Sequence, residues 1–371
     1  MNNVDKQYLD IVRDILDKGT KKQTRAGEVL SVFDRTMRFD LKDGLPLLTT
    51  KKVFTKGCIF ELLWFLSGNT NIKYLLENNV NIWTDDAYRY YKELCEKHNI
   101  NAAYLTVKIV NKEEFIKKTL NGDTEEFILV IDEDDVYKEK LIKYHFGDLG
   151  DVYGKQWRRF GISQFDQIQH IVEMLLTNPD DRRMLCVAFN PDVLYSAESC
   201  ALPPCHVMFQ FYTRELTYQE RLDWYNKNYI ENINNDNLYS VVLEESESDE
   251  SLDELNVPKR ELSLSFWCRS QDFPLGTPFN ILSYSLLTYM MCKIVNMVPG
   301  ELIYHGGDCH IYTNQIEGIK EQLKRNGSDK LPKLKFTEGK EFKNITDFVY
   351  EDFIIENYYP DPVIKFPLSV G

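Results

Sequence analysis

The sequence predicts an α+β fold, in one large domain or two. Strand-like and helix-like segments are mixed along the chain, without the regular alternation that is typical of a parallel α/β sheet. No internal repeat is present, and 43% of the 371 residues are hydrophobic, which is enough to bury a sizeable core. These observations favour a single mixed fold over a repeat protein or a doubly wound sheet.

The first part of the chain contains both helical and extended patterns. Apolar residues recur at helical spacing from Tyr8 to Leu16, and residues 30–41 alternate as a strand does. Residues 59–66 predict a mostly apolar helix that contains Glu61. Because a carboxylate is costly to bury, Glu61 should be paired, shifted in pKa or turned toward a cavity. The alternative is that Glu61 lies on an exposed face of the helix.

The middle of the chain contains a segment that differs from its surroundings. Residues 88–144 are rich in lysine and glutamate and less periodic, so we expect an appended, variable subdomain with a strand at 127–131. Residues 147–159 predict a glycine-punctuated loop dense in hydrogen-bonding groups. A helix and two short strands are then expected, at 166–176, 184–189 and 207–212.

A second unusual segment covers residues 217–259. Within it, residues 244–254 hold seven acids and no base, so this run should be solvated and mobile. We interpret the segment as an inert surface insertion. The elements expected after it are a strand, a long apolar helix, another strand and a short helix, at 262–270, 278–295, 302–312 and 316–324.

Charge and cysteine content narrow the class of protein. The formal net charge is −14, which argues against general nucleic-acid binding. The eight cysteines are widely and irregularly spaced without a C-x-x-C pair, which favours free thiols over a zinc site. No signal or transit peptide and no membrane span are recognisable. We expect a soluble, intracellular (cytoplasmic) protein without a metal.

The stretch Ala201-Leu-Pro-Pro-Cys-His206 presents a candidate nucleophile. Two prolines stiffen the loop before Cys205, and a thiol becomes a good nucleophile once it loses its proton. The alternative is that Cys205 is a buried, inert small residue, as most free cysteines are.

Four arginines at turns or strand ends could form a phosphate site, because several guanidinium groups together can hold a dianion. They are Arg25, Arg182, Arg183 and Arg269. Surface salt bridges are the commoner fate of any one of them.

Two polar groups could bind the rest of a nucleotide. Asn280 follows a loop that contains Ser270 and Asp272, and its amide offers one donor and one acceptor, which matches the N3–H and O4 edge of uracil. The alternative for Asn280 is helix N-capping. His310 and Tyr312 point to the same side of a predicted strand, where ordinary core contacts are the alternative.

The ordered set of motifs is more specific than any single one. They are Thr24-Arg25-Ala-Gly, Pro46-Leu-Leu-Thr-Thr-Lys-Lys52, Glu61-Leu-Leu-Trp-Phe-Leu-Ser-Gly-Asn-Thr-Asn-Ile72, Asn81-Ile-Trp83, Gly147-Asp-Leu-Gly-Asp-Val-Tyr-Gly-Lys-Gln-Trp-Arg158, Asp180-Asp-Arg-Arg183, Pro203-Pro-Cys-His206, Arg269-Ser-Gln-Asp272, Leu275-Gly-Thr-Pro-Phe-Asn-Ile281 and Gly307-Asp-Cys-His-Ile-Tyr312. In this order, and over nearly the whole chain, they resemble the folate-dependent thymidylate synthase family.

The resemblance implies a fold and an activity. The fold is a single domain over residues 1–371, with a large mixed or antiparallel twisted sheet covered by helices, in a homodimer that packs through the sheet. The activity is reductive methylation of dUMP to dTMP, with 5,10-methylenetetrahydrofolate as one-carbon and hydride donor. In the family a cysteine thiolate attacks C6 of uracil, so that C5 becomes a carbanion equivalent.

The resemblance also implies a role for each matching residue. Cys205 matches the nucleophile, Glu61 the acid–base, Tyr153 and His206 the water network, and Arg269 a phosphate ligand that should lower the pKa of the thiol. The other substrate ligands implied are Arg25, Arg183, Ser270, Gln210, Asp272, Asn280, His310 and Tyr312, with Arg182 and Arg183 completing the site of the partner subunit. The folate contacts implied are Trp83, Asp272, Gly276, Phe279 and Val370.

Departures from the family pattern leave two alternatives open. Residues 84–86 are Thr-Asp-Asp where the family has Asp-Glu-Trp, and the chain ends at Gly371, one residue beyond the usual apolar terminus. Both changes fall on the folate side, so a dUMP hydroxymethylase of the same superfamily is one alternative, whereas Asn280 argues against dCMP. A non-catalytic nucleotide- or nucleic-acid-binding regulator is the other, and the acidic charge argues against it.

Overall fold

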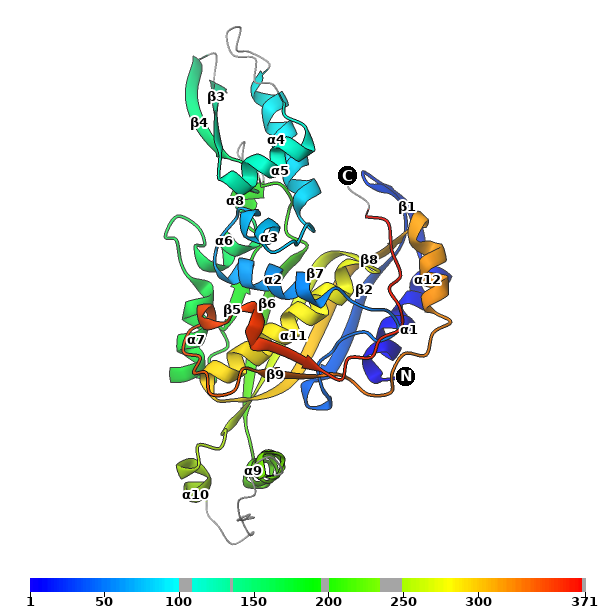
Figure 1. Cartoon of the computed structure of the whole chain (residues 1–371), viewed down its shortest axis with the longest axis vertical. Coiled ribbons are helices and arrows are strands. Elements are labelled where there is room, and N and C mark those ends of the chain that lie inside the picture. The colour runs from blue at the N-terminus through cyan, green and yellow to red at the C-terminus, as the bar shows by residue number, and fades with distance from the viewer. Residues whose placement is uncertain (100–108, 134–135, 195–199, 234–248, 369–371) are drawn as a thin grey trace.

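The computed structural model describes residues 1–99, 109–133, 136–194, 200–233 and 249–368. Its centre is a six-stranded sheet in the order β1-β2-β8-β7-β6-β5 (Figure 1). The strands β7 and β8 are parallel, and the other neighbours are antiparallel. The sheet is therefore mixed, as expected for the α+β class. Its strands are β1 (Thr20–Thr24), β2 (Gly27–Asp40), β5 (Leu185–Val187), β6 (His206–Glu215), β7 (Arg260–Asp272) and β8 (Val298–Tyr312).

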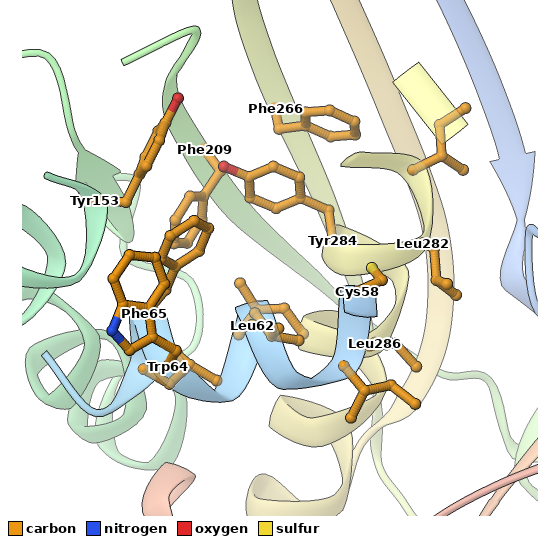
Figure 2. Close-up of a cluster of buried hydrophobic side chains, with 14 of the residues drawn as sticks. Cys58, Leu62, Trp64, Phe65, Tyr153, Phe209, Phe266, Leu282, Tyr284 and Leu286 are labelled. Atoms are coloured by element: carbon orange, nitrogen blue, oxygen red, sulfur yellow. The ribbon is translucent and has the colours of Figure 1, made fainter. Parts of the chain in front are cut away.

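Three long helices cover one side of this sheet. The helix α1 (Asn3–Lys18) packs on β2, and α11 (Gly276–Val295) packs on β7 and β8. The helix α2 (Thr55–Leu66) packs against α11 and is apolar almost all round, as a helix covered on several sides should be. Figure 2 shows the resulting cluster, in which Leu62 and Phe65 of α2 lie near Tyr284 of α11 and Phe209 of β6.

The remaining elements of the main body are short. They are α3 (Lys73–Glu77), α6 (Tyr153–Arg158), α7 (Gln167–Thr177), α8 (Pro191–Leu194), α12 (Ile316–Gln322), β9 (Lys333–Phe336), β10 (Phe353–Glu356) and four 3₁₀ turns at Leu41–Asp43, Thr313–Gln315, Ile345–Asp347 and Tyr350–Asp352.

The helix α6 corrects the prediction of a loop through residues 147–159. A Cβ added at Gly154 would lie 3.0 Å from the backbone oxygen of Phe65 and 2.9 Å from that of Asn69. The glycine therefore permits close packing of α6 on α2, where Tyr153 and Trp157 become buried. In the sequence, Gly154 suggested a loop rather than a helix at this position.

The segment predicted as an appended subdomain folds as two helices and a hairpin, which extend from the top of the molecule in Figure 1. These elements are α4 (Thr84–Asn99), α5 (Lys112–Asn121), β3 (Thr124–Glu133) and β4 (Val136–His145). The ring of Tyr91 packs 5.4 Å from that of Phe115 and 5.1 Å from that of Phe146, measured between centroids. The strand expected at 127–131 lies within β3.

The second unusual segment contributes α9 (Tyr218–Ile233) and α10 (Asp249–Glu254). Arg221, which is 4% exposed, donates to Asp249 at 2.6 Å and to Asp253 at 2.7 Å. Both carboxylates remain exposed, as the prediction of a solvated acidic run expects, but ion pairs with a buried arginine hold them. Residues 244–248 of the run lie outside the described residues.

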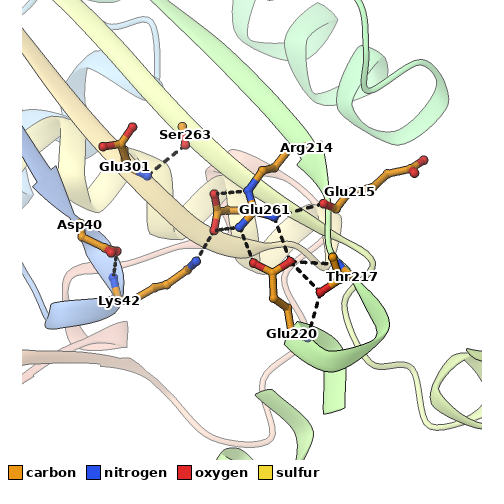
Figure 3. A network of polar contacts seen from close by, with 9 residues as sticks. All are labelled: Asp40, Lys42, Arg214, Glu215, Thr217, Glu220, Glu261, Ser263 and Glu301. Atoms are coloured by element: carbon orange, nitrogen blue, oxygen red, sulfur yellow. Dashed lines mark hydrogen bonds and ion pairs between the residues drawn. The ribbon is translucent and has the colours of Figure 1, made fainter. Parts of the chain in front are cut away.

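A polar network ties the start of this segment to the sheet. Figure 3 shows Arg214 of β6 between two carboxylates, with Glu220 of α9 at 2.7 Å and Glu261 of β7 at 3.0 Å. Lys42 also pairs with Glu261. In the described parts of the chain, no helix is long and apolar enough to cross a membrane.

Candidate active site

Cys205 directly precedes β6 and is partly buried. Its backbone is held by hydrogen bonds to two separate elements. Its backbone N–H donates to the hydroxyl of Tyr153 on α6 at 2.7 Å, and its carbonyl accepts from the backbone N–H of Arg269 on β7 at 2.8 Å. The two prolines before it restrict the approach of the chain. The position of the thiol is thereby fixed by α6, β7 and its own loop.

The guanidinium of Arg269 holds the same loop. Its Nε donates to the carbonyl of Pro204 at 2.8 Å and one Nη donates to that of Pro203 at 3.0 Å. As expected, the charge of Arg269 acts to lower the pKa of the Cys205 thiol, but other causes outweigh it. Burial raises the pKa of this thiol, Asp86 and Asp272 add to the rise, and the charge of Arg269 opposes them only in part.

Glu61 lies on α2 and is largely buried rather than on an exposed face. Its Oε1 accepts a hydrogen bond of 2.7 Å from the indole N–H of Trp83. Burial raises the pKa of Glu61 to about 7, and the hydrogen bond from Trp83 counteracts part of that rise. A carboxyl group with this pKa can both donate and accept a proton near neutral pH.

His206 is buried and neutral. Its Nδ1 is 2.7 Å from the hydroxyl of Tyr284, and its ring stacks on that of Tyr153 with centroids 3.9 Å apart. Burial lowers the pKa of His206 to about 3, so the ring carries no proton that would charge it at neutral pH. A ring with so low a pKa is a weak base for the neighbouring thiol.

Asn280 lies inside α11 rather than at its N-cap, because the helix already begins at Gly276. Its Nδ2 donates to Oε1 of Gln271 at 3.2 Å and lies 3.7 Å from Sγ of Cys268. The N-capping alternative is therefore wrong, and the side chain is held by the end of β7.

Asp272 connects this end of β7 to the C-terminal segment. Its Oδ1 accepts from the backbone N–H of Leu275 at 3.1 Å, and its Oδ2 accepts from Nε2 of Gln315 at 3.1 Å. The same Nε2 donates to the carbonyl of Pro367 at 3.2 Å. Burial raises the pKa of Asp272, and hydrogen bonds from Gln315 and Leu275 oppose the rise.

His310 and Tyr312 lie on β8 with their ring centroids 5.3 Å apart. Nδ1 of His310 is 3.1 Å from Asp308, which also accepts from Ser31 at 2.8 Å and from Lys22 at 2.9 Å. These contacts link β8 to β1 and β2 beside Asp272, because residue 272 pairs with residue 310 in the sheet.

The other arginines lie apart from the Cys205 loop. Arg25 is exposed in the turn between β1 and β2. Arg182 is exposed, and Gln210 donates to its carbonyl at 3.0 Å. Arg183 pairs with Asp181 at 2.6 Å. Within the described chain, therefore, contacts join the candidate nucleophile to Arg269 but do not join it to the other three cations.

The remaining candidates fall in two groups. Ser270, on β7, pairs with Asp308 of β8, whereas Gly276 and Phe279 lie in the first turns of α11 beside Asn280. Val370 lies outside the described residues.

Three functional candidates escaped the sequence analysis: Gln271, Gln315 and Lys51. Lys51 is buried, donates to the carbonyl of Pro274, and has its pKa lowered to about 7 by that burial. Lys51 and Gln271 lie within the matching motifs, whereas Gln315 lies outside them, and a buried amide or lysine has no distinctive spacing. Among the described residues, no group of three or more His, Cys, Asp or Glu side chains could hold a metal ion.

Comparison with known proteins identifies the class and then the family. The family described as "Thymidylate synthase" matches residues 6–370. A thymidylate synthase of Listeria monocytogenes serotype 4b (strain F2365) is 36% identical over 369 residues, which is 98% of this chain and 100% of that protein. The protein of the same name from Listeria innocua serovar 6a is similar to the same extent, with 36% identity over 369 residues. The fold and these matches show that the chain is a methyltransferase. The chain belongs to the thymidylate synthase family.

Proposed function

We propose that this chain converts dUMP to dTMP, with 5,10-methylenetetrahydrofolate as the donor of both the carbon and the hydride. The observation that carries the proposal is a connected set of contacts around the thiol. Tyr153 binds the backbone of Cys205 at 2.7 Å and stacks on His206, and Trp83, whose ring centroid is 6.3 Å from that of Tyr153, binds Glu61 at 2.7 Å. The nucleophile and the acid–base are thus joined through two aromatic side chains.

In this proposal Cys205 Sγ bonds to C6 of the uracil, and the proton that leaves the thiol is passed to the surrounding groups. Burial raises the pKa of this thiol, which disfavours the thiolate in the free enzyme, and in this proposal the thiol loses its proton as it attacks the bound substrate. Glu61, with a pKa of about 7, can move a proton at O4 and C5 through water. Neutral His206 orients that water without competing for the proton.

The nucleotide is held at three points. Asn280 contacts the uracil edge, His310 and Tyr312 contact the ribose, and the phosphate lies against cationic and hydroxyl groups. The phosphate ligands proposed are Arg25, Arg269, Ser270 and the amide of Gln210 from one subunit, and Arg183 from the other. On the folate side, Asp272 has a fixed carboxylate and Trp83 a buried indole, which suits a planar heterocycle with N–H groups. Gly276, Phe279 and Val370 are further folate contacts that the family resemblance implies.

A homodimer would complete the phosphate site. Phe33 and Tyr212 are 78% and 68% exposed although both lie in the central sheet. A groove of about 530 Å³ on the sheet is lined by Arg182, Gln210 and Tyr212, among others. A second copy packed on the sheet would cover these aromatic side chains and bring Arg182 and Arg183 to the other subunit's nucleotide.

The second candidate is hydroxymethylation of dUMP, in which water rather than hydride captures the methylene carbon. It rests on the changed residues 84–86. Where the sequence departs from the family, Asp86 binds Arg89 at 3.0 Å, and Arg89 donates to the carbonyl of Ala201 at 3.0 Å, so the altered folate side is tied to the loop before Cys205.

The experiment that separates the two candidates is product identification from dUMP and 5,10-methylenetetrahydrofolate. We expect dTMP and dihydrofolate. Hydroxymethyl-dUMP and tetrahydrofolate would establish the second candidate. Binding of dUMP without turnover would indicate the non-catalytic alternative.

A further inference from the structure

A second carboxamide controls the orientation of Asn280. Gln271 lies on β7 and is 2% exposed, and its Oε1 accepts the hydrogen bond of 3.2 Å from Asn280 Nδ2. The contact joins the C-terminal end of β7 to the first turns of α11. Gln271 is buried and Asn280 is partly buried, so the Gln271 side chain cannot turn into solvent to relieve a mismatch.

The direction of this hydrogen bond decides which end of the Asn280 amide remains available. Nδ2 faces Gln271 and Cys268, both through acceptor atoms. Among the described residues, no donor is directed at Asn280 Oδ1. Asn280 therefore offers a free acceptor, with one N–H of its amide already engaged.

The backbone leaves room for this pairing. A Cβ added at Gly276, the first residue of α11, would lie 2.6 Å from Gln271 Nε2, which is closer than real Cβ contacts come. A side chain at position 276 would displace the Gln271 amide. The glycine is thus explained by the close approach of Gln271, independently of any contact with folate.

We propose that Gln271 is a positioning residue that determines pyrimidine specificity by fixing the polarity of Asn280. An exposed Oδ1 accepts from N3–H of uracil, whereas N3 of cytosine carries a lone pair and would face it as a second acceptor. A flipped Asn280 would suit cytosine, but it would turn Oδ1 toward Oε1 of Gln271. This inference rests on the proposed function, because it assumes that Asn280 contacts the pyrimidine.

The test compares Gln271→Met, which keeps the length but removes the acceptor, with Gln271→Glu, which keeps an acceptor. Equilibrium binding of dUMP and of dCMP is measured by calorimetry for both variants and for the wild type. In Gln271→Met the two orientations of Asn280 become about equally populated, so dUMP binding weakens only about twofold. Binding of dCMP strengthens about tenfold, since the cost of one mismatched hydrogen bond is removed. Gln271→Glu retains the preference for dUMP.

Gln322→Met is the matched control, because Gln322 is also fully buried and donates one hydrogen bond, to Thr50 at 3.0 Å. It should leave the ratio of the two affinities unchanged. An unchanged ratio in Gln271→Met would overturn the inference. A wild-type protein that makes no product from dUMP would instead overturn the proposed function, and the two failures are therefore distinguishable. Should Gln271→Met not fold, Gly276→Ala displaces the Gln271 amide instead, and it should also lower the ratio of dUMP to dCMP affinity.

Discussion

The hydrogen bond between Trp83 and Glu61 should set the pH dependence of the reaction. Replacing Trp83 by Phe removes the donor that lies 2.7 Å from Oε1 and leaves the carboxyl group buried. A hydrogen bond to a charged group contributes about 1.5–3 kcal/mol, and about 1.4 kcal/mol corresponds to one pH unit. Because this bond stabilises the ionised form, its loss should raise the pKa of Glu61 from about 7 by about one pH unit or more.

The assay is the pH profile of kcat/KM for dUMP at saturating folate, for the wild type and for Trp83→Phe. The part of the pH profile that reports the titration of Glu61 should move to higher pH, whatever the change in the absolute rate. Trp64→Phe is the control, since Trp64 is also buried but donates to the carbonyl of Asn71 at 2.9 Å. A folded Trp83→Phe variant in which this part of the profile stays in place, or moves to lower pH, would refute the assignment.

Two further predictions concern the nucleophile and the second inserted segment. Cys205→Ser should abolish covalent trapping by 5-fluoro-dUMP with methylenetetrahydrofolate, as seen by mass spectrometry, and undiminished trapping would show that another residue attacks C6. Arg221→Met should accelerate hydrogen exchange in residues 249–257 by roughly tenfold, because Asp249 and Asp253 lose a buried partner, while turnover is unchanged. Lys259→Met, which loses only an exposed pair with Asp253, should have little effect, and equal exchange in both variants would contradict the role of Arg221.

Periodic segments of the fold were predictable from the sequence. The helices α2 and α11 and the strands β2, β7 and β8 are long and carry clear apolar patterns, so their type follows from burial on one or more faces. The strand β1 was not assigned, because all its residues are exposed and carry no such pattern. Pairing with β2 alone defines it.

The pKa values and hydrogen-bond partners of the site residues were less predictable than the identity of those residues. The stiff loop around Cys205 and the buried Glu61 follow from local sequence. The direction of the Cys205 pKa does not, because it depends on burial and on Asp86, more than a hundred residues upstream. The partners Gln271 and Gln315 were missed for the same reason, since each acts through a contact that only the folded chain creates.

The central claim is that Cys205 activates C5 of dUMP for transfer of a methylene group that is then reduced by the folate. The most direct measurement follows, in one reaction, the release of tritium from dUMP labelled at C5 and the formation of dihydrofolate. We predict equal amounts of both in the wild type and neither in Cys205→Ser. Tritium release without dihydrofolate would contradict reduction by the folate, and dihydrofolate formation by Cys205→Ser would contradict the role of the thiol.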